Sequence, residues 1–278
     1  MDIRFFKMHG AANDFVLVDD RTLAFPAQDR QWIAAICARR TGIGCEGLIL
    51  IQPSAVADVR MRFFNPDGGE VDMCGNGARC LARLAFELGA VPASMTMETR
   101  AGRLSADVLL GGRVRLTMTP PTDWRMGRHL HVAEHWREYH FVNTGVPHAV
   151  LEVDDLDAVD VADLGPGIRH HSDFQPAGTN VDFVQVTGPR SLRVRTYERG
   201  VEAETLACGT GIVAAALTMA RAGRLELPAD VTPASGDLLE VDARPAADGG
   251  YEGVTLTGPA EHVFEGTVRY PGPSAARG

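Results

Sequence analysis

Two cysteines in this chain share one short motif, and no other residues in the sequence have a setting so well suited to chemistry. Cys74 stands in residues 73–77 (MCGNG) and Cys208 in residues 207–211 (ACGTG). Each motif leads into an apolar pattern of helical spacing that ends at a glycine fifteen residues past the cysteine. Both cysteines are therefore expected at the start of a helix.

A cysteine at a helix start is a candidate acid or base. The first helical turn presents N–H groups without intrahelical acceptors and the positive end of the helix dipole. These groups stabilise a thiolate and should lower the pKa of the thiol from roughly 8.5 toward neutrality. Because Gly75, Gly77, Gly209 and Gly211 lack side chains, a substrate carboxylate can approach the N–H groups closely. Each motif is a candidate anion cradle beside a candidate base.

One such cysteine would be explained better as a small buried hydrophobe at a helix cap. Two at equivalent positions of a duplicated fold predict helix starts that face one cleft. A carbon between Cys74 and Cys208 could lose a proton on one face and gain one on the other, as thiolate and thiol share one proton. The N–H groups would stabilise the enolate. This two-base inversion requires no metal or organic cofactor.

The duplication is supported by three pairs of segments in the same order. Cys74 and Cys208 are 134 residues apart, residues 10–20 match 145–155 at an offset of 135, and residues 44–51 match 178–185 at an offset of 134. A length of 278 residues suits two domains. We expect domains at 1–120 and 121–262, divided at Pro120-Pro121, with a C-terminal strand around 263–271 as a candidate addition to the first.

Hydrophobic patterns predict the α+β class, with two pseudo-symmetric domains, each an antiparallel β-sheet or barrel around a central buried helix. Residues 212–220 are apolar nearly all round, so their helix must be enclosed. The helix after Cys74 is expected to turn Arg79 and Arg83 away from its apolar face. A further helix is predicted at 28–40. The acid-rich segment 152–163 is expected to be a solvated surface.

Composition excludes several classes of protein. The net charge is −9 and Lys/Arg-rich runs are missing, so the sequence gives no footprint for nucleic acid. It shows neither a signal peptide nor an apolar stretch of bilayer length, which predicts a cytoplasmic protein without a membrane partner. The five cysteines include no Cys-x-x-Cys pair, so we expect neither a disulfide framework nor a metal site. Cys37, Cys45 and Cys80 are expected to be packing residues, and His129 and His131 solvated. A pyridoxal Schiff base would depend on Lys7, the single lysine.

The motifs closely resemble those of the diaminopimelate epimerase family, pyridoxal-independent enzymes of lysine and peptidoglycan precursor synthesis. The resemblance implies conversion of LL-2,6-diaminopimelate to the meso form, with Cys74 and Cys208 as the acid–base pair. The matching segments extend over almost the whole chain and are residues 10–15 (GAANDF), 64–68 (FNPDG), 73–79 (MCGNGAR), Asn180, 197–200 (YERG) and 207–211 (ACGTG).

The same resemblance assigns roles to further residues. It implies that His148 and Glu198 set the pKa values of the cysteines, although alone His148 would be a routine turn histidine. The implied contacts to the distal end of the substrate are Asn13, Asn65, Asn180 and Arg199. Those to the reacting end are Gly75, Asn76, Gly209 and Thr210. Gly47 and Glu198 are two further implied contacts. Two positions depart from the family pattern. Val146 replaces an asparagine, and residues 44–47 (GCEG) replace Gly-Ala-Asp, both at the specificity end.

Three other functions stay open on the sequence. A racemase of the same fold could act on another amino acid, which Val146 and Gly47 allow. A thiol redox protein could cycle Cys74 and Cys208 through a disulfide. A non-catalytic amino-acid binding module would keep its affinity without either cysteine. In each amino-acid hypothesis the partner is a small molecule, and a homodimer is compatible with the sequence.

Overall fold

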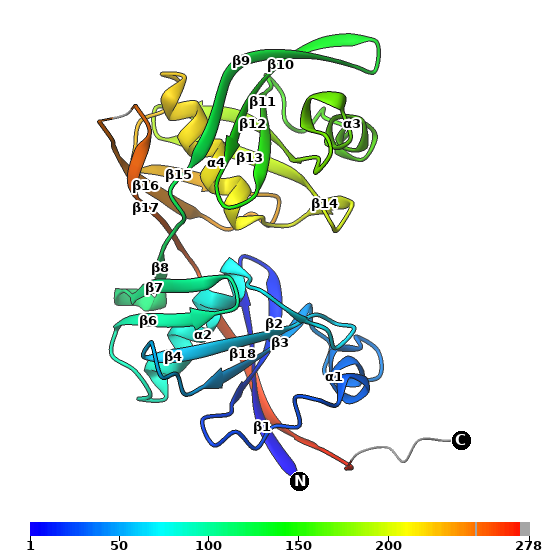
Figure 1. Ribbon diagram of the computed structural model, residues 1–278, viewed down its shortest axis with the longest axis vertical. Coiled ribbons are helices and arrows are strands. Elements are labelled where there is room, and N and C mark those ends of the chain that lie inside the picture. The colour runs from blue at the N-terminus through cyan, green and yellow to red at the C-terminus, as the bar shows by residue number, and fades with distance from the viewer. Residues whose placement is uncertain (248, 273–278) are drawn as a thin grey trace. The chain divides into compact units, whose positions relative to one another are not determined.

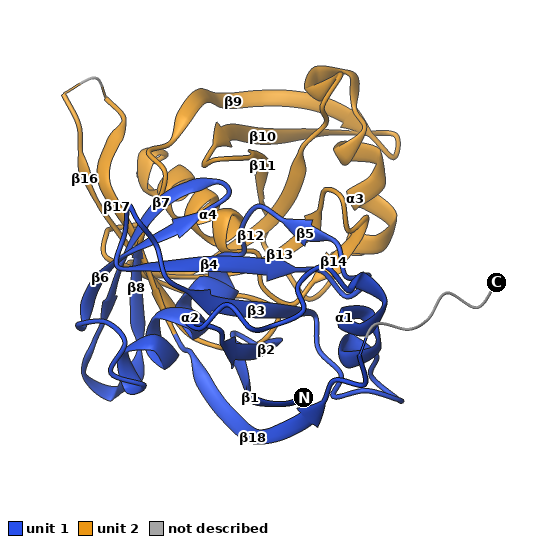
Figure 2. Ribbon diagram, turned by 60° about the horizontal axis from the view of Figure 1, so that its bottom comes forward, with its two compact units in different colours: residues 1–116, 259–278 blue, residues 117–258 orange. Residues whose placement is uncertain are grey.

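The computed structural model describes residues 1–247 and 249–272, and Figure 1 shows the order of their elements. The chain forms two compact units (Figure 2). Unit 1 contains Met1–Leu116 and the segment from Pro259 onward, and unit 2 is Thr117–Gly258. The sequence-based boundaries had been set after residues 120 and 262.

Unit 1 is a curved sheet with two helices, α1 (Arg30–Cys37) and α2 (Gly75–Glu87). The short strand β5 (Glu70–Val71) pairs with β4. The other strands are, in spatial order, β18 (Glu261–Arg269), β1 (Asp2–Gly10), β2 (Asn13–Asp19), β3 (Gly47–Gln52), β4 (Val59–Phe64), β6 (Ser94–Thr99), β7 (Gly102–Val108) and β8 (Val114–Thr117).

Unit 2 has the same design, with helices α3 (Val161–Arg169) and α4 (Gly209–Arg221). Here the short strand β14 (Ala203–Thr205) pairs with β13. The other strands are, in spatial order, β9 (Thr122–Val132), β10 (His135–Asn143), β11 (Pro147–Glu152), β12 (Asn180–Gly188), β13 (Ser191–Glu198), β15 (Ala229–Thr232), β16 (Leu239–Pro245) and β17 (Tyr251–Gly258).

The two units repeat one pairing pattern, which confirms the predicted pseudo-symmetric α+β fold. The sheets are mixed, however, and not purely antiparallel as expected. In unit 1, β2 pairs in parallel with β3 and β4 with β6; in unit 2, β11 pairs in parallel with β12 and β13 with β15. Parallel neighbours require a long crossover connection. The four helices, α1 to α4, supply one crossover each.

The central helix of each unit is buried on nearly all sides, as Figure 1 shows for α2 and α4 among their strands. The prediction for α4 is confirmed. For α2 the prediction that Arg79 faces away from the core is wrong, because its side chain is fully buried. Its guanidinium donates from Nε to the Pro259 carbonyl at 3.1 Å and from Nη2 to Asn76 Oδ1 at 2.9 Å. These acceptors offset the cost of burying the charge.

Helix α1 is shorter than predicted, and α3 was missed. Asp29 caps α1 by accepting from the Trp32 N–H at 3.0 Å, which sets its start. Helix α3 lies within and beyond the acid-rich segment and contains Gly165 and Pro166, two residues that normally oppose helix formation. A Cβ at Gly165 would lie 2.5 Å from the Tyr197 ring. The glycine therefore lets α3 pack closely on β13.

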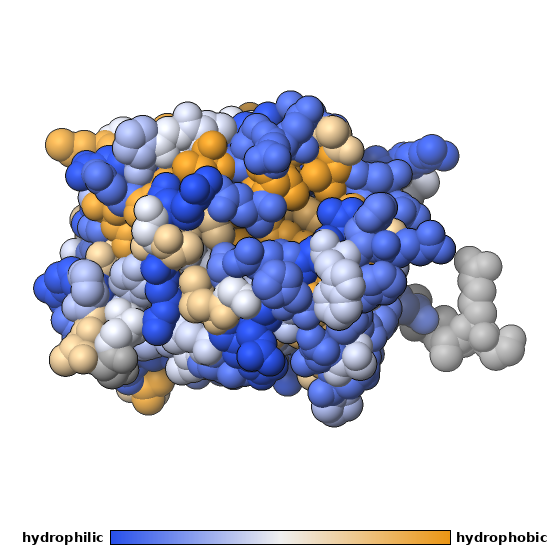
Figure 3. Space-filling model, turned by 90° about the horizontal axis from the view of Figure 1, so that it is seen from above, coloured by the Kyte–Doolittle hydropathy of each residue, from blue (hydrophilic) through white to orange (hydrophobic). Residues whose placement is uncertain are grey.

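In the part of the chain that the structure describes, none of the helices is long and apolar enough to cross a bilayer. On the face shown in Figure 3, hydrophilic residues predominate and apolar residues form smaller groups between them.

His129 and His131 lie on β9 and His135 and His140 on β10. Within the described residues, no group of three or more His, Cys, Asp or Glu side chains could hold a metal ion.

Candidate active site

Each motif cysteine occupies the N-cap position of the central helix of its unit. Cys74 precedes α2 with φ −139° and ψ 123°, and Cys208 precedes α4 with φ −103° and ψ 109°. Neither side chain caps its helix. The carbonyl groups of Cys74 and Cys208 accept the first helical hydrogen bonds, from Ala78 at 2.8 Å and Ile212 at 2.9 Å. The thiols are therefore placed beside the positive helix ends, as the sequence predicts.

The motif glycines divide into two kinds. A Cβ at Gly75 would meet nothing within 4 Å, so the Cβ side of this residue is open, and at Gly209 it would meet only Leu256 at 3.4 Å. At Gly77 it would lie 2.7 Å from Ile49 Cδ1, and at Gly211 it would lie 2.5 Å from an Asp182 oxygen. The first glycine of each motif can face a ligand. The second lets the helix start pack closely on its own sheet, on the side where a Cβ would stand.

Cys208 is buried, with 8% of its surface exposed. Burial raises the pKa of the Cys208 thiol, and the carboxylates of Glu198 and Asp182 raise it further. Hydrogen bonds from Thr210 and the Gly211 N–H lower this pKa without reversing the direction. The prediction of a lowered pKa is therefore wrong for Cys208, because helix position alone did not reveal the depth of burial or the nearby acids.

His148, at the start of β11, is fully buried and belongs to a chain of polar contacts. Its Nδ1 lies 2.7 Å from Asp182 Oδ2, and neither side chain is exposed. Its Nε2 lies 3.0 Å from Thr210 Oγ1, which is 3.5 Å from the Cys208 sulfur. Thr196 donates to the other Asp182 oxygen at 2.7 Å. Sequence reasoning missed Asp182 and Thr196, although an aspartate within the apolar run 180–186 is a signal that would have found the first.

Other predicted residues of unit 2 lie around the same helix start. Asn180 is buried and ties two segments together, since its amide donates to the Pro147 carbonyl at 2.9 Å and its oxygen accepts from the Arg199 N–H at 2.8 Å. Glu198 accepts from Thr205 Oγ1 at 2.9 Å. The Arg199 guanidinium lies 3.4 Å from the Ala177 carbonyl.

The predicted residues of unit 1 are grouped near the start of α2. A Cβ at Gly10 would lie 2.8 Å from the Asn76 carbonyl, so the β1–β2 turn packs against the first turn of α2. Asn13 begins β2 at this turn. Its Oδ1 is buried, and among the described residues it has no hydrogen-bond partner. An acceptor buried without a donor costs about 1–3 kcal/mol, which a ligand N–H would offset.

Two further unit 1 residues differ in exposure. Gly47 is buried opposite Phe15 at the start of β3, and a Cβ there would lie 2.2 Å from the Phe63 ring. Asn65 is exposed in the turn after β4, where its N–H donates to the Gly69 carbonyl at 2.8 Å. Gly47 therefore contributes close backbone packing in addition to any ligand contact.

The remaining cysteines and Lys7 are buried in unit 1. Cys37, Cys45 and Cys80 have at most 2% of their surface exposed, as expected of packing residues, and burial raises the pKa of Cys80 to about 12. The ammonium of Lys7 contacts the Asp14 carboxylate at 2.5 Å and also the Gly44 carbonyl. This lysine is thus bound within the sheet.

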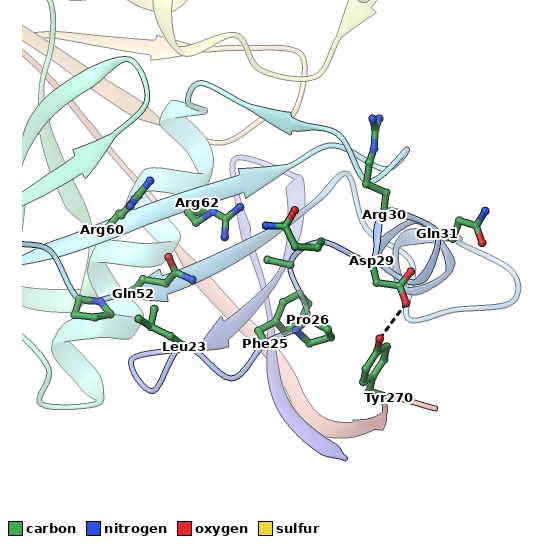
Figure 4. Close-up of a pocket in the computed structure, with 13 residues that line it drawn as sticks. Leu23, Phe25, Pro26, Asp29, Arg30, Gln31, Gln52, Arg60, Arg62 and Tyr270 are labelled. Atoms are coloured by element: carbon green, nitrogen blue, oxygen red, sulfur yellow. Dashed lines mark hydrogen bonds between the residues drawn. The ribbon is translucent and has the colours of Figure 1, made fainter. Parts of the chain in front are cut away.

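A cavity of about 830 Å³ lies in unit 1 beside α1 (Figure 4). None of the predicted site residues lines it. Several of the polar side chains that line the cavity already have partners. Arg62 pairs with Glu70 at 2.8 Å, and at the opposite wall Asp29 accepts a hydrogen bond from the Tyr270 hydroxyl at 3.1 Å. The predicted chemistry therefore does not belong to this cavity.

Comparisons with known proteins agree on one family. A family model described as diaminopimelate epimerase matches residues 5–124 and 140–263. The diaminopimelate epimerase of Chlorobaculum tepidum is 44% identical over 94% of this chain and 99% of its own. The enzyme of Aquifex aeolicus is 41% identical over 96% and 98%.

Solved structures share the fold at low identity. A Bacillus anthracis phenazine biosynthesis protein of the PhzF family has a TM-score of 0.70 at 17% identity, covering 97% of this chain and all of its own. A probable proline racemase from Agrobacterium radiobacter has a TM-score of 0.69 at 16% identity, covering 96% and 93%. These two matches support the doubled α+β fold alone.

Proposed function

Since the chain belongs to the diaminopimelate epimerase family, we propose that it inverts one α-carbon of LL-2,6-diaminopimelate to give the meso form. This reaction would supply lysine and peptidoglycan precursor synthesis. Near-complete coverage of curated relatives supports the proposal, because the whole length of their chains is represented here.

One structural observation carries the mechanism: in each unit a cysteine occupies the N-cap position of the buried central helix, next to a glycine with open space on its Cβ side. We assign Cys74 and Cys208 as the two bases. One thiolate removes the α-proton, and the other thiol protonates the opposite face of the carbanion. No cofactor takes part in these steps.

The carbanion is stabilised as an enolate of the α-carboxylate. At the positive helix ends, hydrogen bonds to this negative charge would come from the N–H groups of Gly75, Asn76, Gly209 and Thr210. Loss of one such donor costs on the order of 10²- to 10³-fold in kcat in other enzymes. A few oriented N–H groups therefore provide a large share of the acceleration.

The distal end of the substrate carries an ammonium and a carboxylate group. We assign Asn13, Asn65, Asn180 and Arg199 to this end. The buried Asn13 oxygen supports the assignment, because an ammonium would supply the donor it lacks among the described residues. Gly47 and Glu198 complete the proposed set.

Glu198 and His148 adjust the pKa values of the catalytic cysteines. Burial and the Glu198 charge raise the pKa of Cys208 and so favour its thiol over its thiolate. The thiols must stay reduced for this chemistry, which favours the cytoplasm as the proposed location. Assembly as a homodimer stays a prediction.

The test is isotope exchange in deuterated water. LL-diaminopimelate should gain solvent deuterium at one α-carbon as the meso form appears, measured by NMR and mass spectrometry. Cys74→Ala and Cys208→Ala should each reduce epimerisation by at least about 10³-fold, comparable to loss of other catalytic acid–base groups. Cys80→Ala, at a buried cysteine within α2, is the matched control and should retain activity.

The same experiment separates the other functions. Exchange on a different amino acid, with none on diaminopimelate, would identify a racemase of another substrate. A redox protein would turn over peroxide or a disulfide, whereas the proposed enzyme is only inactivated by oxidation and restored by reductant. A binding module would keep its affinity in both alanine variants and catalyse no exchange.

A further inference from the structure

We propose that Asp182 is a positioning residue that holds His148 in a proton relay, through the Thr210 hydroxyl, to the Cys208 sulfur. The inference rests on the proposed function and assigns a role to two residues, Asp182 and Thr196, that the sequence motifs do not include. All the groups belong to unit 2.

The relay is a continuous line of hydrogen-bonding atoms. Asp182 Oδ2 is 2.7 Å from His148 Nδ1, His148 Nε2 is 3.0 Å from Thr210 Oγ1, and that oxygen is 3.5 Å from Cys208 Sγ. The Thr210 backbone carbonyl is held by the Thr144 hydroxyl at 3.0 Å. The Thr210 hydroxyl therefore lies between the His148 imidazole and the Cys208 sulfur.

Two proton arrangements satisfy every group in the line. In the first, Cys208 is a thiol that donates to Thr210 Oγ1, and the threonine hydroxyl donates to an unprotonated His148 Nε2. In the second, the Cys208 S–H bond is broken, its proton is on Thr210, and the former threonine proton forms an N–H bond at His148. The threonine hydroxyl then donates to the thiolate. Atoms and charge balance without an outside acid or base.

Asp182 makes the second arrangement accessible. A buried imidazolium requires a charged partner, because an uncompensated charge in the interior is costly. Thr196 donates to Asp182 Oδ1 at 2.7 Å, so Oδ2 remains directed at His148 Nδ1. This bond keeps a proton on Nδ1 and leaves Nε2 for Thr210.

Unit 1 has no such relay at the matching positions. The parallel ladder of unit 1 begins with Phe15 opposite Gly47, and that of unit 2 with His148 opposite Asn180. Two residues further along the second strand, Ile49 faces Phe63 across its ladder, whereas Asp182 faces Thr196. At these ladder positions unit 1 has apolar side chains or glycine, so they cannot form the same relay.

Cys208 has a specific need for such a device. Its thiol pKa is raised chiefly by burial, and the charged groups that face it, Glu198 at the end of β13 and Asp182 on β12, raise it further. To act as a base, Cys208 must nevertheless lose its proton. A relay that delivers the proton to His148 replaces direct loss to solvent and leaves the thiolate beside an imidazolium, the pairing that activates cysteines elsewhere.

The decisive experiment uses thiolate alkylation in the intact protein. Iodoacetamide reacts with the thiolate, and mass spectrometry resolves Cys208 from Cys74 as an internal reference. If Asp182 only repels the thiolate, Asp182→Asn should speed alkylation of Cys208, as Glu198→Gln should. If the relay operates, Asp182→Asn should slow it at least about tenfold, equal to one pK unit, while Glu198→Gln still speeds it. Asp230→Asn, at an exposed aspartate of β15, is the matched control and should leave the rate unchanged.

Turnover supplies the second measurement. Asp182→Asn should lower kcat for LL-diaminopimelate by on the order of 10²- to 10⁴-fold, the range seen when a histidine loses its orienting carboxylate. KM should stay close to the wild-type value because Asp182 does not touch substrate. The pH profile of kcat should lose the limb that belongs to the Cys208–His148 pair.

A threonine series keeps the test decisive if Asp182→Asn fails to fold by circular dichroism. Thr210→Val should slow Cys208 alkylation as Asp182→Asn does, and Thr210→Ser should restore it. Faster or unchanged alkylation in Asp182→Asn, or an unchanged rate in Thr210→Val, would overturn the relay. A wild-type protein inactive on diaminopimelate would refute the proposed function instead, since alkylation requires no substrate.

Discussion

Gly211→Ala should damage the protein more than any other single methyl group added to the two cysteine motifs. The new Cβ would stand 2.5 Å from Asp182 Oδ1 and 3.2 Å from Thr196 Oγ1, whereas ordinary contact begins at 3.4 Å. The carboxylate cannot turn aside, because Thr196 and His148 hold its two oxygens at 2.7 Å each. The helix start or the acid must therefore shift by most of an ångström.

The expected cost follows from these contacts. Overpacking costs about 1–3 kcal/mol, and weakening a hydrogen bond to a charged group adds about 1.5–3 kcal/mol. Replacing a helical glycine by alanine returns about 0.5–1 kcal/mol. The free energy of unfolding should fall by about 1.5–5.5 kcal/mol, measured by urea denaturation at constant m-value.

Two glycines of α2 calibrate this result. Gly77→Ala meets Ile49 Cδ1 at 2.7 Å, the far end of a flexible side chain, and should cost less than Gly211→Ala. Gly75→Ala meets nothing within 4 Å and should be neutral or stabilising. A Gly211→Ala protein as stable as wild type, or more stable than Gly77→Ala, would show that Asp182 is not held as described.

Two further predictions concern unit 1. Arg79→Met should lower the free energy of unfolding by about 2–4 kcal/mol in urea, because the bonds to Pro259 and Asn76 disappear while their buried acceptors remain. For Glu70, hydrogen bonding to Arg62 holds its pKa below the usual value, so its stabilisation is present above the unfolded-state pKa of about 4.3 and is lost as the pH falls through the folded-state pKa. Glu70→Gln should therefore cost about 0.3–1 kcal/mol at pH 7 in urea unfolding and progressively less as the pH falls through the folded-state pKa of Glu70, whereas a constant difference would contradict the ion pair.

The features that could be predicted from the sequence are those set by neighbouring residues. A glycine-bounded apolar run fixes α4, and the motif around Cys208 fixes where it begins. The central helices and both cysteine positions were accessible for this reason.

The features that were missed depend on partners distant in sequence. Asp182 meets His148 across 34 residues, and Arg79 reaches the Pro259 carbonyl across 180. Neither pattern nor propensity encodes such contacts. The raised pKa of Cys208 has the same origin, because burial and opposing carboxylates are created by the sheet around the helix, and the helix start alone suggested the reverse.

A two-base inversion requires its bases to be unequal at every moment, one protonated and the other not. A perfectly duplicated fold would make two identical cysteines. Here the backbone is duplicated while the side chains under the helix starts are not: Gly77 abuts the methyl group of Ile49, and Gly211 abuts the carboxylate of Asp182. The repeat thus gives each sulfur the same place at a helix start, and in the proposed two-base reaction the divergence beneath the helices would make the two cysteines unequal.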